Sequence, residues 1–494
     1  MTRFDSQWFR FQWLRIFGAI TAITFIVSAT TTAQVHPVYT ALNSGFESGG
    51  YTPDIWPSGY LALGQDGNFY GTTNFNQSNI YMMTPSGVET LLWESGQGAG
   101  DQCEWGADGI FYGGLTLGSD GTFYGVCAMW GNYSGGYYIS YNGGSSVNVF
   151  SPFSTSNTSP NPLILAPDGN LYGTTVNGGA YGTGSVIKLT PSGELTTLYS
   201  FKEGTASGYS PEGPLALGRN GDLYGTTPVG GLVDTDGAAG VFFQITTKGK
   251  FKVLYTFPPS NLGGDGLNPT AGVTLGNDGN FYGTTYAGGA NGEGIIFKIS
   301  AAGKKLTKLH DFNNKVDNAG YPIFPLTLGS DGNFYGASPD TASGGFGPES
   351  LFEITPKGVY TDLYDGFGSP DTCPYESPQG CLVSSPLTQH PNGSFYGTTG
   401  EGGVNDGVFF SLNVGLKPFV ALQFPIGAPG STLGIFGQGF SKATAVSFNG
   451  TAATFNVVSD TYMTAKVPTG AKLGYVTVTE GSTSLKSNVE FDPK

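Results

Sequence analysis

Histidine and cysteine are both scarce in this chain of 494 residues. The three histidines are His36, His310 and His390, and no two share a position in the repeat described below, so we expect no histidine-based acid–base or metal site. None of the four cysteines forms a Cys-x-x-Cys pair, which excludes the usual spacing of a zinc site. We therefore predict no metal and no cofactor, and we name no catalytic residue.

Charge is scarce as well, because Asp, Glu, Lys and Arg make up only 12% of the residues. The net charge is −15, whereas binding to a phosphate backbone needs patches of Lys and Arg, so no nucleic-acid partner is expected. Aromatic residues reach 14%, and disordered chains have few aromatics and more charge. The composition therefore predicts a folded protein.

Long apolar runs are missing beyond the N-terminus. Three arginines precede an apolar run at residues 16–29, and small residues follow up to Ala33. Residues 1–33 resemble a secretory signal peptide, since the run is shorter than the roughly 20 residues of a comfortable membrane span. An uncleaved anchor is the alternative. With cleavage, we expect no membrane span and a protein that is secreted or held in the cell envelope.

Glycine is abundant, with 81 residues, and it punctuates an internal repeat. A Tyr-Gly pair that follows a Gly-x-Asp-Gly turn, or a variant of it, recurs at intervals of 48 to 61 residues, which is the length of propeller blades. We number the copies one to seven by the tyrosine of this pair: Tyr70, Tyr124, Tyr172, Tyr224, Tyr282, Tyr335 and Tyr396.

Copy three shows the whole unit at residues 162–201, PLILAPDGNLYGTTVNGGAYGTGSVIKLTPSGELTTLYSF. Four short apolar runs are separated by Asp-Gly and Ser-Gly turns and a glycine-rich loop, which predicts four antiparallel strands. Seven such units predict an all-β fold with a seven-bladed β-propeller at residues 34–412. Copy seven lacks a fourth strand, and residues 38–46 match it, so we expect them to complete blade seven and leave no open edge.

The Asp-Gly turn between the first and second strands allows two interpretations. As scaffold, its glycine supplies a positive φ, while Phe69 and Tyr70 point to opposite faces of the next strand and pack on neighbouring blades. As a calcium site, it would need six to eight oxygens, yet each turn offers one carboxylate and copy four has Asn220 instead. We interpret the turn as scaffold.

The connections between blades, and those after each second strand, vary in length and composition. Variable loops on a rigid scaffold are where binding usually occurs, and aromatic rings suit stacking on sugars or on apolar groups. The alternative is that these rings only hold their own loops in place. The predicted ligand-binding residues are Trp56, Trp105, Trp130, Tyr133 and Tyr137.

An even number of cysteines in an exported chain favours disulfide bonds. Cys103 and Cys127 lie near the same end of a predicted hairpin in copy two. Cys373 and Cys381 share the long loop before copy seven. We expect these two pairings as hypotheses.

The pattern changes after a linker at residues 413–417. Short alternating strands with Gly and Pro turns at residues 418–494 predict a small Ig-like sandwich. The strings GQGF, VSFNGTAATF and VPTGAKLGYVTV resemble the IPT/TIG family. That resemblance implies an Ig-like spacer or interaction module without catalytic residues.

The repeats resemble the GloVer repeat family of bacterial exported proteins. Strings close to LYGTT-x-x-GG-x-x-x-x-GxVFK occur at residues 171–189 and 281–299, and the resemblance covers residues 39–412, although copies one, two and six depart from it. It implies export and tandem repeats, without an assigned activity. The PDGNLYG strings also resemble streptogramin-lyase propellers, but those depend on a histidine and metal-binding acids, and histidine is scarce here.

The expected function is non-catalytic binding of a glycan or a protein, by a monomer at the bacterial surface or outside the cell. One alternative is a carbohydrate-active or lyase-type enzyme, since glycoside chemistry needs two carboxylates across a cleft. Another is a purely structural envelope protein. The loop carboxylates for catalysis would be Asp101, Glu104, Asp108, Glu293, Glu401 and Asp406.

Overall fold

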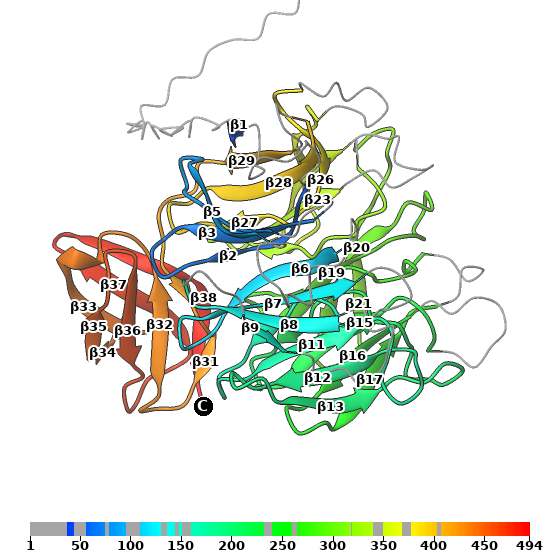
Figure 1. The fold of residues 1–494 in the computed structure, drawn as a ribbon, viewed down its shortest axis with the longest axis horizontal. Helices are drawn as coiled ribbons and strands as arrows, with labels where there is room; N and C mark the ends of the chain where they lie inside the picture. Colours follow the sequence, from blue (N-terminus) through cyan, green and yellow to red (C-terminus); the bar gives the residue numbers. More distant parts are fainter. Residues whose placement is uncertain are drawn as a thin grey trace, which may run out of the picture. The chain divides into compact units, whose positions relative to one another are not determined.

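Short strands separated by glycine turns dominate the structure (Figure 1). The computed structural model describes residues 37–43, 56–74, 79–94, 109–129, 136–143, 148–150, 160–231, 240–258, 264–317, 319–338, 349–367, 377–402 and 407–494. No α-helix occurs in these ranges. The all-β fold predicted from the glycine turns is therefore confirmed.

Copies three to six each form a four-stranded antiparallel sheet, with the strands in chain order. The strands of copies three and four are β10 (Ile164–Leu165), β11 (Leu171–Thr175), β12 (Ser185–Leu189), β13 (Leu195–Ser200), β14 (Ala216–Leu217), β15 (Leu223–Thr227), β16 (Val241–Ile245) and β17 (Phe251–Thr256). Those of copies five and six are β18 (Val273–Leu275), β19 (Asn280–Thr285), β20 (Ile295–Ser300), β21 (Leu306–Asp311), β22 (Thr327–Leu328), β23 (Phe334–Ser338), β24 (Ser350–Ile354) and β25 (Tyr360–Tyr364).

Copies one and two form sheets of the same kind that are joined at one point. Their strands are β2 (Trp56–Leu63), β3 (Phe69–Asn74), β4 (Asn79–Met83), β5 (Glu89–Glu94), β6 (Gly109–Leu117), β7 (Phe123–Met129), β8 (Gly136–Tyr141) and β9 (Asn148–Phe150). Tyr60 of β2 pairs in parallel with Gly114 of β6. This single contact connects the two sheets into one of eight strands.

Copy seven takes a strand from far away in the sequence. Its own strands are β26 (Cys381–Val383), β27 (Thr388–Gln389), β28 (Phe395–Glu401) and β29 (Val408–Asn413). Strand β1 (Val38–Asn43) pairs antiparallel with β29, and Val38 lies opposite Asn413. The outer edge of β29 is therefore covered by residues that precede copy one.

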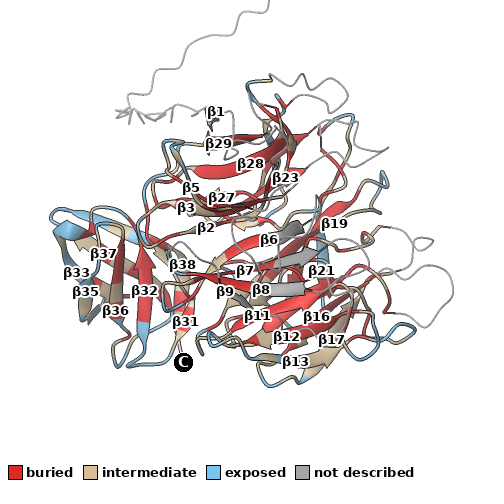
Figure 2. Cartoon of the chain, viewed as in Figure 1, coloured by how far each residue is buried: buried red, intermediate tan, exposed pale blue. Residues whose placement is uncertain are grey.

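The repeated tyrosine packs against the neighbouring copy. Tyr282 stacks on Phe334 of copy six with ring centroids 4.0 Å apart. Tyr396 of copy seven lies 4.7 Å from Phe69 of copy one, so the last and first copies are neighbours in space. The second strands β11, β15 and β23 are buried along their whole length (Figure 2). Burying each large ring stabilises the fold by about 1.5–3 kcal/mol.

The C-terminal residues form a two-sheet sandwich. Its strands are β30 (Ala421–Leu422), β31 (Ile426–Gly427), β32 (Thr432–Phe436), β33 (Ala443–Phe448), β34 (Thr451–Ala453), β35 (Phe455–Val457), β36 (Tyr462–Lys466), β37 (Gly474–Glu480) and β38 (Thr483–Pro493), with the 3-10 turn η3 (Phe440–Lys442). The sheets run β30-β32-β36-β35 and β31-β38-β37-β33-β34, with Ile435, Met463 and Val478 fully buried in their core. Residues Pro37–Lys494, repeats and sandwich together, form one compact unit.

Candidate functional site: an axial cavity beneath the C-terminal domain

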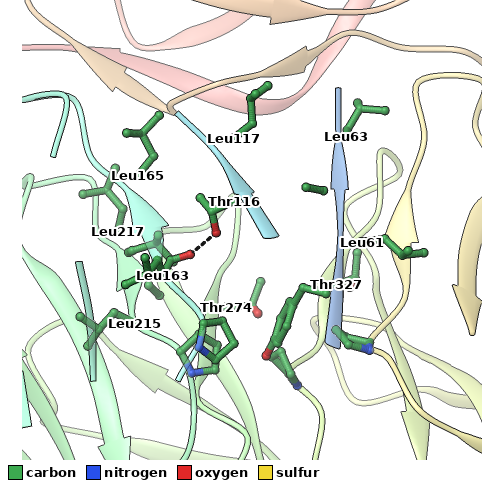
Figure 3. A pocket seen from close by; sticks show the side chains of 18 of the residues that line it. Leu61, Leu63, Thr116, Leu117, Leu163, Leu165, Leu215, Leu217, Thr274 and Thr327 are labelled. Atoms are coloured by element: carbon green, nitrogen blue, oxygen red, sulfur yellow. Dashed lines mark hydrogen bonds between the residues drawn. The ribbon is translucent and has the colours of Figure 1, made fainter. Parts of the chain in front are cut away.

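The first strands of the repeat copies surround a cavity of about 630 Å³, here called the axial cavity (Figure 3). Every copy contributes to its wall, through residues 60–63, 115–117, 162–165, 214–217, 273–275, 325–327, 386–387 and 389. Leucine, alanine and proline make up most of this wall, and no charged side chain occurs among the described residues that line it. The cavity is therefore a mainly apolar space at the point where the copies meet.

Threonine hydroxyls of copies two, five, six and seven donate to the next copy, three of them from the cavity wall and one from Thr388, which lies beside wall residues in the sequence. Within the described residues these bonds run from Thr116 to the carbonyl of Leu163, from Thr274 to Leu326, from Thr327 to Leu387 and from Thr388 to Leu61, the first three at 2.5 Å and the last at 3.3 Å. The last bond joins copy seven to copy one. Because these hydroxyls already donate to a carbonyl oxygen, they offer a ligand no free donor.

The aspartate of each turn is engaged within its own copy. Oδ1 of Asp66 accepts a hydrogen bond from the backbone amide of Asn68 at 3.1 Å, and Oδ2 accepts one from the hydroxyl of Tyr70 at 3.0 Å. The same tyrosine–aspartate bond joins Tyr124 to Asp120, Tyr172 to Asp168, Tyr282 to Asp278 and Tyr335 to Asp331. No group of three possible metal ligands occurs in the described part of the chain. This geometry supports the scaffold interpretation of the turn.

The turn of copy five shows how these bonds shift pKa values. Burial alone would raise the pKa of Asp278, but hydrogen bonds from Lys298, Asn280 and Tyr282 outweigh it and lower the pKa to about 2. Burial is the main cause that raises the pKa of Tyr282 to about 12. Its hydrogen bond to Asp278 acts in the same direction. The pair is therefore most stable as a carboxylate bound to a protonated phenol.

The C-terminal domain contacts the turns of the repeats at one recurring position, the residue that precedes the Asp or Asn of the turn. That residue is Gln65 in copy one, Arg219 in copy four, Asn277 in copy five and Pro391 in copy seven. The carbonyl oxygen of Gln65 accepts hydrogen bonds from the hydroxyls of Ser459 and Thr461, at 3.0 and 2.7 Å. The carbonyl oxygen of Pro391 accepts one from the backbone amide of Phe419 at 3.0 Å.

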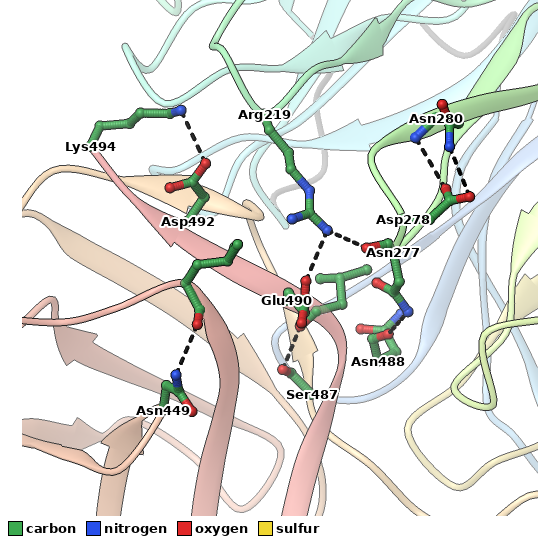
Figure 4. Close-up of polar contacts among 12 residues, drawn as sticks. Arg219, Asn277, Asp278, Asn280, Asn449, Ser487, Asn488, Glu490, Asp492 and Lys494 are labelled. Carbon is green, nitrogen blue, oxygen red and sulfur yellow. Dashed lines mark hydrogen bonds and ion pairs between the residues drawn. The ribbon is translucent and has the colours of Figure 1, made fainter. Parts of the chain in front are cut away.

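Arg219 and Asn277 hold the last strand of the C-terminal domain (Figure 4). Nη2 of Arg219 lies 3.1 Å from Oε2 of Glu490 and also donates to the carbonyl oxygen of Asn277 at 2.6 Å. The side-chain amide of Asn277 donates to the carbonyl oxygen of Asn488 at 3.0 Å. Leu422 of the same domain is part of the cavity wall. The C-terminal domain therefore covers the axial cavity at the end where the turns lie.

The sequence did not predict this interface. The turn position that carries it is Gln, Ser, Pro, Arg, Asn, Ser or Pro in the seven copies, so no single chemistry marks it. The one available signal was the variation itself, since the residues on either side repeat closely. Arg219 and Asn277 make their contacts through side chains, whereas Gln65 and Pro391 use only the backbone carbonyl oxygen, so residue type does not mark the position.

The predicted ligand-binding aromatic residues are not tested by the structure. Trp105, Trp130 and Tyr133 lie outside the described residues. Trp56 begins β2, and Tyr137 lies in β8 opposite Cys127, but nothing about their side chains is described. Their role in binding stays a prediction.

A described aromatic residue on a variable loop was missed. Tyr181 lies in the loop between β11 and β12, and 56% of its surface is exposed. Nζ of Lys202 lies 5.1 Å from the centre of its ring, a distance that allows a cation–π contact. The sequence signal was weak, because this tyrosine sits in the glycine-rich stretch that we interpreted as a connection.

The two disulfide pairings also stay predictions. Cys381 in β26 is fully buried and disulfide-bonded. Cys103 and Cys373 lie outside the described residues, and nothing about the side chain of Cys127 is described. The pairing within the long loop before copy seven therefore needs chemical mapping.

Of the candidate acid–base residues, the structure describes His310, His390, Glu293 and Glu401. Nε2 of His310 lies 2.8 Å from Oδ2 of Asp317, and its ring stacks on Tyr360 with centroids 4.1 Å apart. Glu293 accepts a hydrogen bond from the backbone amide of Asn314 at 2.6 Å. Glu401 ends β28. The remaining candidates, which are His36, Asp101, Glu104, Asp108 and Asp406, lie outside the described residues.

Comparison with known families identifies both parts of the chain. The Gloeobacter/Verrucomicrobia repeat matches residues 111–261 and 232–425, which together span residues 111–425, or 315 of 494. The chain belongs to this repeat family. An IPT/TIG domain matches residues 419–492. Both predicted resemblances are confirmed. The match to the repeat family does not include copy one, although the strands of copy one form the same kind of sheet as those of the other copies.

Solved structures give only distant likenesses to this member of the repeat family. A protein of unknown function from Bacteroides caccae is 16% identical, with 54% of this chain and 84% of that one covered and a TM-score of 0.32. A putative TolB from Agrobacterium tumefaciens is 13% identical, with coverage of 66% and 94% and a TM-score of 0.37. A puromycin hydrolase is 11% identical, with coverage of 74% and 54% and a TM-score of 0.43.

No curated protein matches the chain. Among the described residues, no helical segment meets the length and hydropathy of a transmembrane span. The combination of this repeat with an IPT/TIG domain indicates a binding-type protein.

Proposed function

We propose that this member of the repeat family is an exported, non-catalytic binding protein that recognises a glycan or a protein through its loop face. The loop face comprises the connections between second and third strands and the connections between copies. The observation that carries the proposal is the position of the C-terminal domain on the hairpin turns at Gln65, Arg219, Asn277 and Pro391. Antiparallel strands put turns and loops at opposite ends of each sheet, so a partner meets the loops.

The architecture that goes with this function is a closed ring of seven blades. The proposal assigns residues 34–412 to the ring, residues 413–417 to a linker and residues 418–494 to the C-terminal domain, after removal of residues 1–33. Support comes from the pairing of β1 with β29 and from two contacts between copies seven and one, which are the Tyr396–Phe69 contact and the bond from Thr388 to Leu61. A closed ring keeps the loop face rigid.

Tyr181 gives the loop face a described aromatic ring that is available for stacking. Exposed tyrosine rings stack on the flat faces of sugars and on apolar groups of proteins. Its neighbour Lys202 adds a donor for a hydroxyl or a carboxylate. The predicted aromatic residues Trp105 and Trp130 would extend the same face into copy two.

The test is a binding assay on a panel of insoluble and soluble polysaccharides that records both retained protein and released sugar. Three variants accompany the unmodified protein: Tyr181→Ala, the double variant Trp105→Ala/Trp130→Ala, and the control Val359→Ala. Val359 is 60% exposed and lies in a hairpin turn rather than in a loop. We expect retention without release, weakened in the first two variants and unchanged in the control.

Each outcome has a separate meaning. Release of sugar would contradict non-catalytic binding and direct attention to the loop carboxylates Glu293 and Glu401. Retention that the loop variants leave unchanged would contradict the loop face as the binding surface. If no polysaccharide retains the protein, the proposal of a glycan ligand is contradicted. The remaining candidates are then a protein partner and a structural role in the envelope.

A further inference from the structure

The axial cavity is a second candidate site, separate from the loop face. Its volume of about 630 Å³ falls within the roughly 300–1,000 Å³ of small-molecule sites. We infer that it binds the alkyl chain of a small amphiphile. The inference does not depend on which glycan or protein the loops recognise.

In five of the seven copies a half-buried leucine lines the cavity, whereas the equivalent residue is the buried Leu328 in copy six and Gln389 in copy seven. Leu115, Leu215 and Leu326 occupy equivalent positions in three copies and are buried, with 3% exposure each. Two residues later, Leu63 and Leu117 are only half-buried and line the cavity. Covering exposed apolar surface with an apolar group removes it from water and is favourable in free energy. The layer of half-buried leucines is therefore an attractive surface for a hydrocarbon chain.

Four of the six polar side chains in the described wall, those of Thr116, Thr274, Thr327 and Gln389, already make hydrogen bonds. Thr274 and Thr327 donate to carbonyl oxygens of the next copy. The side-chain amide of Gln389 accepts from the backbone amide of Ser330 at 2.9 Å and donates to the carbonyl oxygen of Gly393 at 3.2 Å. An apolar cavity whose wall offers few hydrogen-bond partners holds water weakly and takes apolar guests instead.

The same features exclude the other ligand classes. A sugar or a peptide carries many donors and acceptors, and each one left unpaired in an apolar site costs about 1–3 kcal/mol. A polymer that threads the repeats would also meet the C-terminal domain, whose Leu422 and Phe436 stand in the wall. The occupant must therefore be short and apolar, with any polar head kept outside the leucine layer.

Leu63 is the best position for a test. It lines the cavity but belongs to none of the buried clusters, whereas Leu165 and Leu217 also pack against the C-terminal domain. Leu473 is a matched control, because it is a leucine of the C-terminal domain that is 49% exposed and not part of the cavity wall. The variants are Leu63→Glu, Leu63→Trp and Leu473→Glu.

The experiment uses purified protein expressed from the whole chain and titrates it with N-phenyl-1-naphthylamine, a neutral probe whose fluorescence rises in apolar sites. We expect one saturable site from which dodecanol displaces the probe. Leu63→Glu should weaken binding by about tenfold or more, because it places a charge in an apolar wall. Leu473→Glu should bind as the unmodified protein does.

Two results would overturn the inference. One is the absence of saturable binding, and the other is binding that Leu63→Glu and Leu63→Trp leave intact. Circular dichroism checks that each variant is folded. If the glutamate variant does not fold, the tryptophan variant decides, since it fills the cavity without adding charge and should reduce binding in the same way.

Discussion

Nε2 of His390 lies 3.1 Å from the carbonyl oxygen of Gly67, a contact that joins the turn of copy seven to the turn of copy one across 323 residues. Nδ1 accepts the backbone amide of Asn392 at 3.1 Å, so Nε2 carries the proton and donates it. The ring is buried against Phe69 and Tyr396. Neutral imidazole satisfies both contacts, whereas a second proton would displace the amide of Asn392.

This contact predicts a loss of stability in mild acid. Burial lowers the pKa of His390, and its hydrogen bonds with Asn392 and Gly67 oppose the shift only in part. A lowered pKa in the folded state means that stability is lost as pH falls below the unfolded value of about 6.5. We expect the Tm to decline from that pH downward, and His390→Gln to flatten the decline.

Thermal unfolding followed by circular dichroism at a series of pH values measures this effect. His310→Gln is the matched control, because His310 contacts Asp317 rather than the turn of copy one. The His310→Gln protein should show the same decline in Tm with falling pH as the unmodified protein. If the Tm of the His390→Gln protein declined with pH as strongly as that of the unmodified protein, another titrating group would be the cause.

The tyrosine–aspartate bonds predict a second loss of stability, in alkali. The pKa values of Tyr124 and Tyr282 are raised to about 12, with burial as the main cause. An unfolded tyrosine ionises near pH 10 while these keep their protons, so stability falls as pH rises above about 10. Tyr282→Phe should reduce that slope, measured as the urea midpoint against pH. The exposed Tyr181 provides the control as Tyr181→Phe, and an equal reduction there would contradict the assignment.

The interface between repeats and C-terminal domain predicts a measurable coupling between Arg219 and Glu490. Their side chains are 21% and 28% exposed, so the pair is partly screened and a coupling of about 0.5–1 kcal/mol is expected. A double-mutant cycle with Arg219→Ala and Glu490→Ala measures it, together with amide exchange along β38. The more exposed pair of Lys494 and Asp492 serves as the control. Zero coupling with unchanged exchange would mean that this pair does not hold the domain.

The threonine bonds of the cavity wall predict a cost for losing one hydroxyl. Thr327→Val keeps the shape of the side chain but leaves the carbonyl oxygen of Leu387 without its donor. A fully buried acceptor without a partner costs about 1–3 kcal/mol, and because this bond is part-buried we expect a loss of about 1 kcal/mol in the free energy of unfolding. Thr444→Val, in which an exposed hydroxyl loses a bond to Thr479, should cost well under 1 kcal/mol. Equal costs, measured by urea unfolding, would show that the bond in the wall does not stabilise the fold.

Much of the local structure could be predicted because it depends on neighbouring residues. The Asp-Gly turns, the alternation of short strands and the buried Phe-Tyr pairs such as Phe334 and Tyr335 follow from turn chemistry and from the period of a strand. Tyr181 was not among the predicted ligand-binding residues, because the neighbouring residues in the sequence do not determine how exposed a loop side chain is.

From the amino-acid residues alone, the all-β fold class, the resemblance to the repeat family and the scaffold role of the Asp-Gly turns could be predicted. The tertiary structure decided the relationships between distant copies, such as the contact of His390 with Gly67 and the bond from Thr388 to Leu61. The contacts of Gln65, Arg219 and Asn277 with the C-terminal domain are likewise visible only in the tertiary structure. A repeated motif specifies its own hairpin through short-range interactions, whereas the axial cavity and its cover exist only where all copies meet.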